Sequence, residues 1–137
     1  MRRIEELALE AEVRRRQAMD IESQMRNLQN IEVEIEGTKE ALKNLKEKNI
    51  GIFNLGSGVF VRGELKDVQK LLVNIGAGVF VEKDVDSTLI FLENKKKEIS
   101  EAKKELTTGL EKISQRLAEI HKEAAEIRKA SEESKKR

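Results

Sequence analysis

Hydrophobic residues recur at helical spacing along residues 3–48. The stripe, in steps of three, four or seven, consists of Ile4, Leu7, Ala11, Ala18, Ile21, Met25, Leu28, Ile35 and Leu42. Polar residues interrupt it at Arg14, Glu32 and Lys39. A heptad repeat sustained in this way is typical of a coiled coil. At ~1.5 Å per residue, this helix would be roughly 65–70 Å long.

A second and stricter heptad pattern runs through residues 85–134. One series, spaced by seven, is apolar throughout: Val85, Leu92, Ile99, Leu106, Ile113, Ile120 and Ile127. Its companion series mixes apolar and polar residues: Leu89, Lys96, Lys103, Leu110, Leu117, Ala124 and Ser131. Asp84 precedes this pattern and is a suitable N-cap, and the chain contains no Pro that would break either helix. The two patterns predict an antiparallel coiled coil whose far end carries both chain termini.

The segment between the helices contains nearly the same sequence motif twice, twenty residues apart. Residues 54–61 read Asn-Leu-Gly-Ser-Gly-Val-Phe-Val, and residues 74–81 read Asn-Ile-Gly-Ala-Gly-Val-Phe-Val. Each copy places an apolar run before Gly-x-Gly and a β-branched and aromatic run after it. Glycine supplies the positive φ angles of a tight loop, at Gly56 and Gly58 and again at Gly76 and Gly78. The repeat therefore predicts two β-hairpins.

The hairpins carry apolar residues on both faces, because strand alternation separates neighbouring side chains. The helices bury their narrow stripes against each other, so little of either helix is left to cover four strands. Small sheets with open edges are rarely stable alone. We therefore expect these strands to form an intersubunit β-barrel, with the contacts made by Val59, Phe60, Val61, Val79, Phe80 and Val81.

Composition narrows the class of protein. Of 137 residues, 39% are charged and only four are Phe, with no Trp or Tyr, which favours long solvated helices over a large globular core. The net charge of +1 gives no general argument for nucleic acid. No apolar run has membrane-spanning length and no signal-peptide core follows Met1. With no Cys in the chain, we expect a cytoplasmic protein without a membrane partner; the abundance of Glu, Lys and Arg is thermophile-like.

The expected fold class is α+β, in three parts. Residues 1–49 and 84–137 form the two coiled-coil helices, and residues 50–83 form the hairpin module for oligomerisation. This order, with Leu55-Gly56-Ser57-Gly58 and Ile75-Gly76-Ala77-Gly78-Val79 closing the hairpins, resembles the prefoldin α-type subunit over nearly the whole chain. The paired hairpins are the specific part, because β-type subunits of that family have one.

The resemblance implies a hexamer of two α and four β subunits with a barrel of joined strands. It further implies six coiled-coil tentacles that hold unfolded proteins without ATP and deliver them to a group II chaperonin. Two features depart from the family pattern. Asn54 stands where family members often have Pro, and the chain starts directly in the helix, which would shorten one tip. A divergent α-like paralogue that assembles with itself therefore stays open.

The free ends of the helices are the expected client site. There the stripes end, and fraying exposes seam residues; exposed apolar groups on a flexible support bind many non-native chains. The expected contact residues are Ile4, Leu7, Leu9, Ile120, Ala124 and Ile127. The plain alternative is that these residues are only the last layers of the seam.

Motifs for catalysis or cofactors are weak. The Gly-x-Gly turns lack the Lys-Ser/Thr sequel and the following helix of a phosphate loop. The run Arg14-Arg15-Arg16 has glutamates nearby and reads as a solvated surface. His121 is the single histidine and has no Cys or second His for a metal. We expect no enzyme and no cofactor.

Two functions remain: a subunit of an ATP-independent holdase chaperone, or a structural coiled-coil protein that self-assembles into oligomers or filaments through its hairpins.

Overall fold

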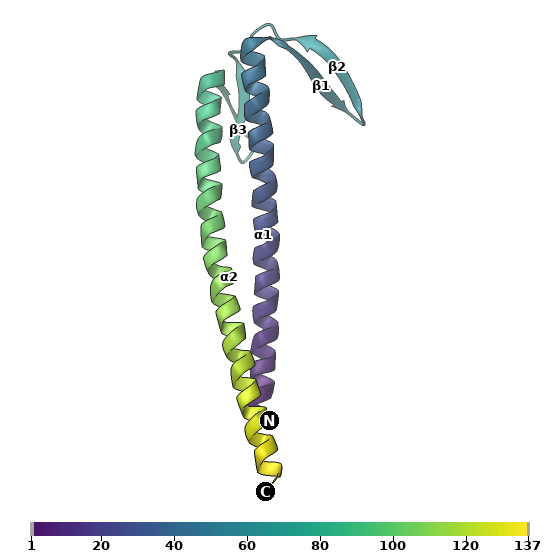
Figure 1. Cartoon of the computed structure of the whole chain (residues 1–137). Helices are drawn as coiled ribbons and strands as arrows, with labels where there is room; N and C mark the ends of the chain where they lie inside the picture. Colours follow the sequence, from purple (N-terminus) through teal and green to yellow (C-terminus); the bar gives the residue numbers. More distant parts are fainter. Residues whose placement is uncertain (1, 137) are drawn as a thin grey trace. The chain divides into compact units, whose positions relative to one another are not determined.

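The structure of the chain is a computed structural model that describes residues 2–136 (Figure 1). Two long helices flank four strands. The elements are α1 (Arg2–Glu47), β1 (Ile50–Gly56), β2 (Val59–Glu64), β3 (Leu71–Gly76), β4 (Val79–Lys83) and α2 (Val85–Lys135). The predicted α+β arrangement of helix, two hairpins and helix is confirmed. Closure of the strands into a barrel between subunits stays a prediction.

The chain divides into two compact units, described here one at a time. The first holds α1 up to Gln29 together with α2 from Ser100 onward. The second, Asn30–Ile99, holds the rest of both helices and all four strands.

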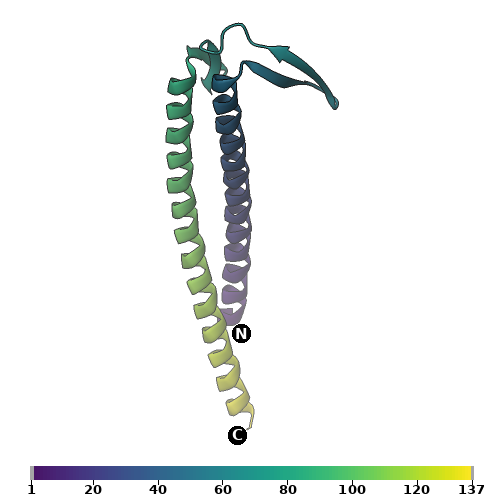
Figure 2. The ribbon, with the colours of Figure 1, turned by 45° about the horizontal axis from the view of Figure 1, so that its top comes forward.

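In the first unit the two helices run side by side and antiparallel (Figure 2). Their seam buries apolar residues of the predicted stripes, among them Leu7, Ala11, Ile113 and Ile120. Gly109 belongs to this seam, since a Cβ atom there would lie 3.4 Å from Cδ1 of Ile21. A glycine inside a helix is usually destabilising, but the missing side chain of Gly109 makes room for the opposite helix.

The helix segments of the second unit continue the same pattern. Ile35, Leu42, Val85 and Ile99 are buried, and the polar seam positions are paired across the helices. Nζ of Lys39 lies 2.6 Å from Oε2 of Glu93, and Nζ of Lys96 lies 2.7 Å from Oε1 of Glu36. Two polar positions of the predicted seams, Lys39 and Lys96, are thus sites of ion pairing, which favours one register over its neighbours.

The start of α2 is fixed by a local cap. The backbone N–H of Ser87 donates to Oδ1 of Asp84 at 2.7 Å, which confirms Asp84 as the N-cap. This hydrogen bond lowers the pKa of Asp84, because the bond stabilises the charged carboxylate. Lys46, in the last turn of α1, lies 2.7 Å from Asp86 in the first turn of α2.

The strands form two separate two-stranded antiparallel sheets, β1–β2 and β3–β4. Both end in the same turn: Gly56 pairs with Val59, and Gly76 pairs with Val79. The two residues in between have positive φ angles in both copies, with Ser57 at 52° and Ala77 at 49°. Positive φ at both central positions is the signature of a type I′ turn, whose twist matches that of the strands.

A β-bulge precedes each turn, and an asparagine supports it. The register shifts between Asn54 and Gly56 and, in the second copy, between Asn74 and Gly76. Oδ1 of Asn54 accepts the backbone N–H of Gly56 at 2.8 Å, and Asn74 does the same for Gly76 at 2.9 Å. Asn54, which departs from the family pattern, therefore has a local role that a proline could not take.

The first hairpin differs from the second at its base, where two glycines face each other. Gly51 pairs with Gly63, and the ring of Phe53 covers both: Cβ atoms added there would lie 3.2 and 3.4 Å from ring carbons. A Cβ on Gly51 would also lie 3.7 Å from Cδ2 of Leu45, so this hairpin base adjoins the end of α1. An aromatic ring over strand glycines compensates for the side chains they lack.

The seam of the first unit yields a direct test. Replacing Ile113, which is 6% exposed, by Asp places an unpaired charge against the apolar residues of the opposite helix. The cost should be several kcal/mol, because a buried charge needs a partner. We expect a clear fall in Tm by circular dichroism. Ser114→Asp, on the exposed neighbouring position, is the matched control and should change Tm little. Equal Tm values in both variants and the parent would show that Ile113 does not lie in a seam.

Candidate functional site

The hairpins expose apolar side chains. Phe60 and Phe80 are each 60% exposed, and Val59 and Val79 are each about half exposed. Val61 is exposed as well, while Val81 is half-buried. The repeat thus places equivalent residues of the two copies in nearly equivalent surroundings. Large exposed apolar patches on soluble proteins mark interaction surfaces.

Each strand also has an unpaired edge, because both sheets contain only two strands. Unpaired backbone N–H and C=O groups on an apolar strand offer a template for another strand. The geometry agrees with the predicted role in assembly, and an intersubunit sheet at these strands stays a prediction.

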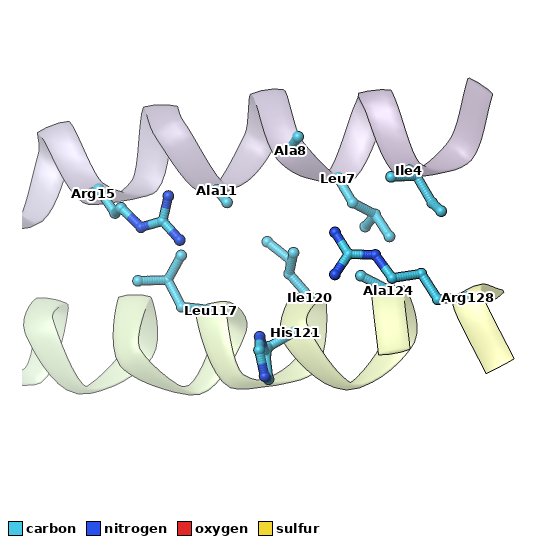
Figure 3. Close-up of a pocket in the computed structure, with 10 residues that line it drawn as sticks. All are labelled: Ile4, Leu7, Ala8, Ala11, Arg15, Leu117, Ile120, His121, Ala124 and Arg128. Atoms are coloured by element: carbon cyan, nitrogen blue, oxygen red, sulfur yellow. The ribbon is translucent and has the colours of Figure 1, made fainter. Parts of the chain in front are cut away.

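The second candidate site lies in the first unit, near the start of α1. A pocket of about 210 Å³ opens there between the two helices (Figure 3). Its lining includes four of the six predicted contact residues: Ile4, Leu7, Ile120 and Ala124. Small residues make the hollow, since Ala8, Ala11 and Ala124 stand where larger side chains would fill the space.

The predicted contact residues differ in how accessible they are. Leu7 and Ile120 are only 1% and 5% exposed and form one apolar cluster with Ala11. Ile4, Ala124 and Ile127 are half-buried, and Ile127 lines an adjoining hollow of about 440 Å³. Leu9 is 64% exposed and belongs to neither lining. The structure therefore joins five of the six predicted residues and separates Leu9 from them.

Ion pairs hold the helices together beside this pocket. Arg116 donates two hydrogen bonds to the carboxylate of Glu10, at 2.7 and 2.8 Å. Arg3 makes a similar pair with Glu123, at 2.9 and 3.3 Å. Such two-bond pairs fix orientation as well as attraction. The hydrogen bond from Arg116 lowers the pKa of Glu10, and that from Arg3 lowers the pKa of Glu123.

Sequence reasoning missed two arginines that line the same pocket. Arg15 and Arg128 reach into it from opposite helices (Figure 3). The run Arg14-Arg15-Arg16 was read as one solvated surface. Arg14 and Arg16 pair with Glu10 and Glu12, and Arg15 is exposed as expected, but it also lines the pocket. The helical phase gives a signal, since Arg15 follows Leu7, Ala8 and Ala11 along one side of the helix.

Candidate metal ligands are not brought together in the part of the chain that the structure describes. Within residues 2–136, no group of three or more His, Cys, Asp or Glu is placed to hold a metal ion. His121 is exposed and lies at the pocket wall. None of the helices in this part of the chain is long and apolar enough to cross a membrane.

Two paired helices, joined by two apolar hairpins with open edges, define a coiled-coil subunit built for association. The family model for the prefoldin subunit matches residues 15–130. The chain belongs to the prefoldin family, whose members are chaperones, and it is an α-type subunit.

Relatives support the same assignment. The chain is 30% identical over 103 residues to prefoldin subunit alpha of Pyrococcus horikoshii, covering 72% of this chain and 70% of the relative. It is 31% identical over 100 residues to prefoldin subunit alpha of Thermofilum pendens, covering 71% and 78%. A chain from the cryo-EM structure of filamentous PFD from Methanocaldococcus jannaschii matches with a TM-score of 0.73 at 16% identity. That match covers 82% of this chain and 96% of the other, and it supports the fold.

The lowered pKa values of Glu10 and Glu123 predict how acid affects the helix pairing. A carboxylate whose pKa is lower in the folded state stabilises the fold above its ordinary value of 4.5, and this contribution is lost as the pH falls through the folded-state pKa. We expect Tm to fall as the pH decreases from about 4.5, measured by circular dichroism. Glu10→Gln with Glu123→Gln should flatten this fall, whereas Glu126→Gln, an exposed control, should not. An unchanged acid profile in the double variant would contradict the assignment.

Proposed function

We propose that this α-type subunit belongs to an ATP-independent holdase that binds non-native proteins at the ends of its helices and delivers them to a group II chaperonin. In this proposal the subunit acts in the cytoplasm, two copies assemble with four β-type subunits, and the hairpins supply the strands that join them. Binding needs neither nucleotide nor metal.

The observation that carries the proposal is the apolar hollow near the start of α1. Ile4, Ala124 and Ile127 remain partly exposed there, and two adjoining hollows of about 210 and 440 Å³ share Ile4. Elsewhere along the first unit the cover varies, since Ile113 is buried whereas Ile21 and Leu106 are half-buried; what distinguishes the end is that its two hollows adjoin. An open apolar hollow at the end of a solvated helix pair suits a site for exposed apolar segments of other chains.

Assembly supports this function by multiplying weak contacts. One shallow hollow buries too little surface for stable binding on its own. Several such ends on one assembly raise the overall affinity, because a segment released by one end is held near the next. The exposed strands carrying Phe60 and Phe80 are the surface proposed to make this assembly.

A second candidate is a structural protein that self-assembles into filaments through its hairpins. One observation favours it: the fold matches a chain from filamentous PFD. Each chain has two nearly identical hairpins, so one chain offers two similar edges for its neighbours. In that case the hollow near the start of α1 would have no client.

Assembly is tested by replacing the two exposed phenylalanines. Phe60→Ser together with Phe80→Ser should dissociate the native assembly while the helices stay largely formed, because both rings lie on strands and not in the seam. Native mass spectrometry with the β-type partner, and on the chain alone, measures the effect and separates mixed hexamers from self-assembly. Glu64→Ser with Glu82→Ser, exposed polar positions of the same strands, is the control. An unchanged native mass in the phenylalanine variant would refute the role of these strands.

Client binding is tested by shortening the helix pair. Deleting residues 1–11 and 120–137 removes the apolar hollow, so an assembly truncated on all its subunits should no longer suppress the aggregation of a denatured client, measured by light scattering. Deleting only residues 131–137, which removes no apolar residue, should leave protection intact. Full protection by the longer truncation, at normal native mass, would place the client surface elsewhere.

A further inference from the structure

Some of the arginines around the hollow form ion pairs with carboxylates, and others do not. Five arginines of the same unit have carboxylate partners within 4 Å: Arg2, Arg3, Arg14, Arg16 and Arg116. Arg15 and Arg128 have no ion pair or hydrogen bond with any residue from 2 to 136. Glutamates are nearby on both helices, so the lack of pairing comes from direction rather than from a shortage of carboxylates.

The direction follows from the antiparallel pairing. Long side chains on a helix lean toward the N-terminus of their own helix. Arg15 on α1 therefore leans toward Ala11, one turn away, and Arg128 on α2 leans toward Ala124. Because the helices run in opposite directions, these two leans converge on the hollow from its two ends. Figure 3 shows both guanidinium groups pointing into the space between the helices, with Ala11 and Ile120 between them.

The floor between the two cations is apolar. Leu7, Ala11 and Ile120 form the buried cluster beneath it, with Leu117 and Ala124 packed against them. The volume of about 210 Å³ exceeds the roughly 150 Å³ of a cavity that holds benzene. One leucine- or phenylalanine-sized side chain therefore fits between the two guanidinium groups.

We infer that this pocket is a binding site for a peptide segment in which an apolar side chain is flanked on both sides by carboxylates. The apolar side chain enters the hollow, and the carboxylates pair with Arg15 and Arg128. An arginine receives a carboxylate through two parallel hydrogen bonds, which gives direction as well as charge. The inference rests on the proposed function, since it specifies which segments of a non-native chain this end prefers.

The surrounding charge favours a peptide over an anionic membrane surface. Glu6, Glu12 and Glu119 are exposed on the same two helices and each pairs with an arginine, so the surface around Arg15 and Arg128 has few uncompensated cations to attract a broad negative surface. A narrow chain that enters between the helices avoids these carboxylates. The site is therefore selective for a local pattern of charge rather than for negative charge in general.

Fluorescence anisotropy with short labelled peptides tests the inference on the purified native assembly. The probes share one scaffold: a leucine flanked by glutamates, the same leucine flanked by lysines, and a serine flanked by glutamates. The first should bind tightest, and the other two should bind at least about tenfold more weakly. Added salt should weaken the first, because exposed charge pairs are screened.

Two variants locate the site. Arg15→Gln with Arg128→Gln should weaken the acidic leucine peptide about tenfold and leave its lysine counterpart unchanged. Arg16→Gln with Lys129→Gln removes the same charge from neighbouring positions outside the pocket lining and should leave the acidic peptide unaffected. Equal binding of the acidic peptide by the parent and the Arg15/Arg128 variant overturns the inference. So does binding of phosphatidylserine vesicles, instead of peptide, that depends on these arginines.

The inference and the proposed function fail separately. If the Arg15/Arg128 variant and the parent both suppress client aggregation and both ignore the acidic peptide, the holdase function stands and the inference falls. If the parent binds the acidic peptide through the two arginines but protects no denatured client, the inference stands and the holdase function falls.

Discussion

The pairing of two narrow apolar stripes is the constraint on which the rest of the structure depends. Each helix presents a seam of a and d positions, and that seam is used up by the opposite helix. Where a polar residue occupies a seam position, as Lys39 and Lys96 do, a carboxylate on the opposite helix meets it. These ion pairs bury little charged surface. They also favour one register of the two helices, because a shifted register would leave the charged side chains in the seam without partners.

The pairing of the helices leaves no apolar helix surface to cover the hairpins. With no helical face left over, Phe60, Phe80 and most of the neighbouring valines stay exposed in the single chain, and a two-stranded sheet cannot cover them itself. Local interactions nevertheless favour the hairpin conformation: a type I′ turn, a bulge supported by an asparagine, and in the first copy a ring over Gly51 and Gly63. Each such contact reduces the conformational entropy that the strands lose on association.

At the other candidate site, charge and apolar surface act together. Two-bond arginine–glutamate pairs hold the helices in register beside a hollow made by alanines. The same antiparallel geometry that makes these pairs directs Arg15 and Arg128 into the hollow, where neither pairs with a residue between 2 and 136. In the proposed holdase function, such a site would hold its ligands weakly and reversibly, so that a bound segment could be released.

Local pattern was enough to predict the secondary structure. The heptads predicted helices at 3–48 and 85–134, and the structure has Arg2–Glu47 and Val85–Lys135; the repeated Gly-x-Gly phrase predicted both hairpins and their turn glycines. Helical phase and strand alternation depend on residues only a few positions apart, so both can be recognised in the amino-acid sequence itself. The clustering of Ile4, Leu7, Ile120 and Ala124 also followed from the antiparallel register. Helical phase also separates Leu9, which lies two residues from Leu7 and off the stripe. What the sequence could not determine was which charges find partners and that Gly109 leaves room for Ile21. These depend on the facing helix, whose side chains meet only when residues about a hundred positions apart are brought together by the tertiary structure.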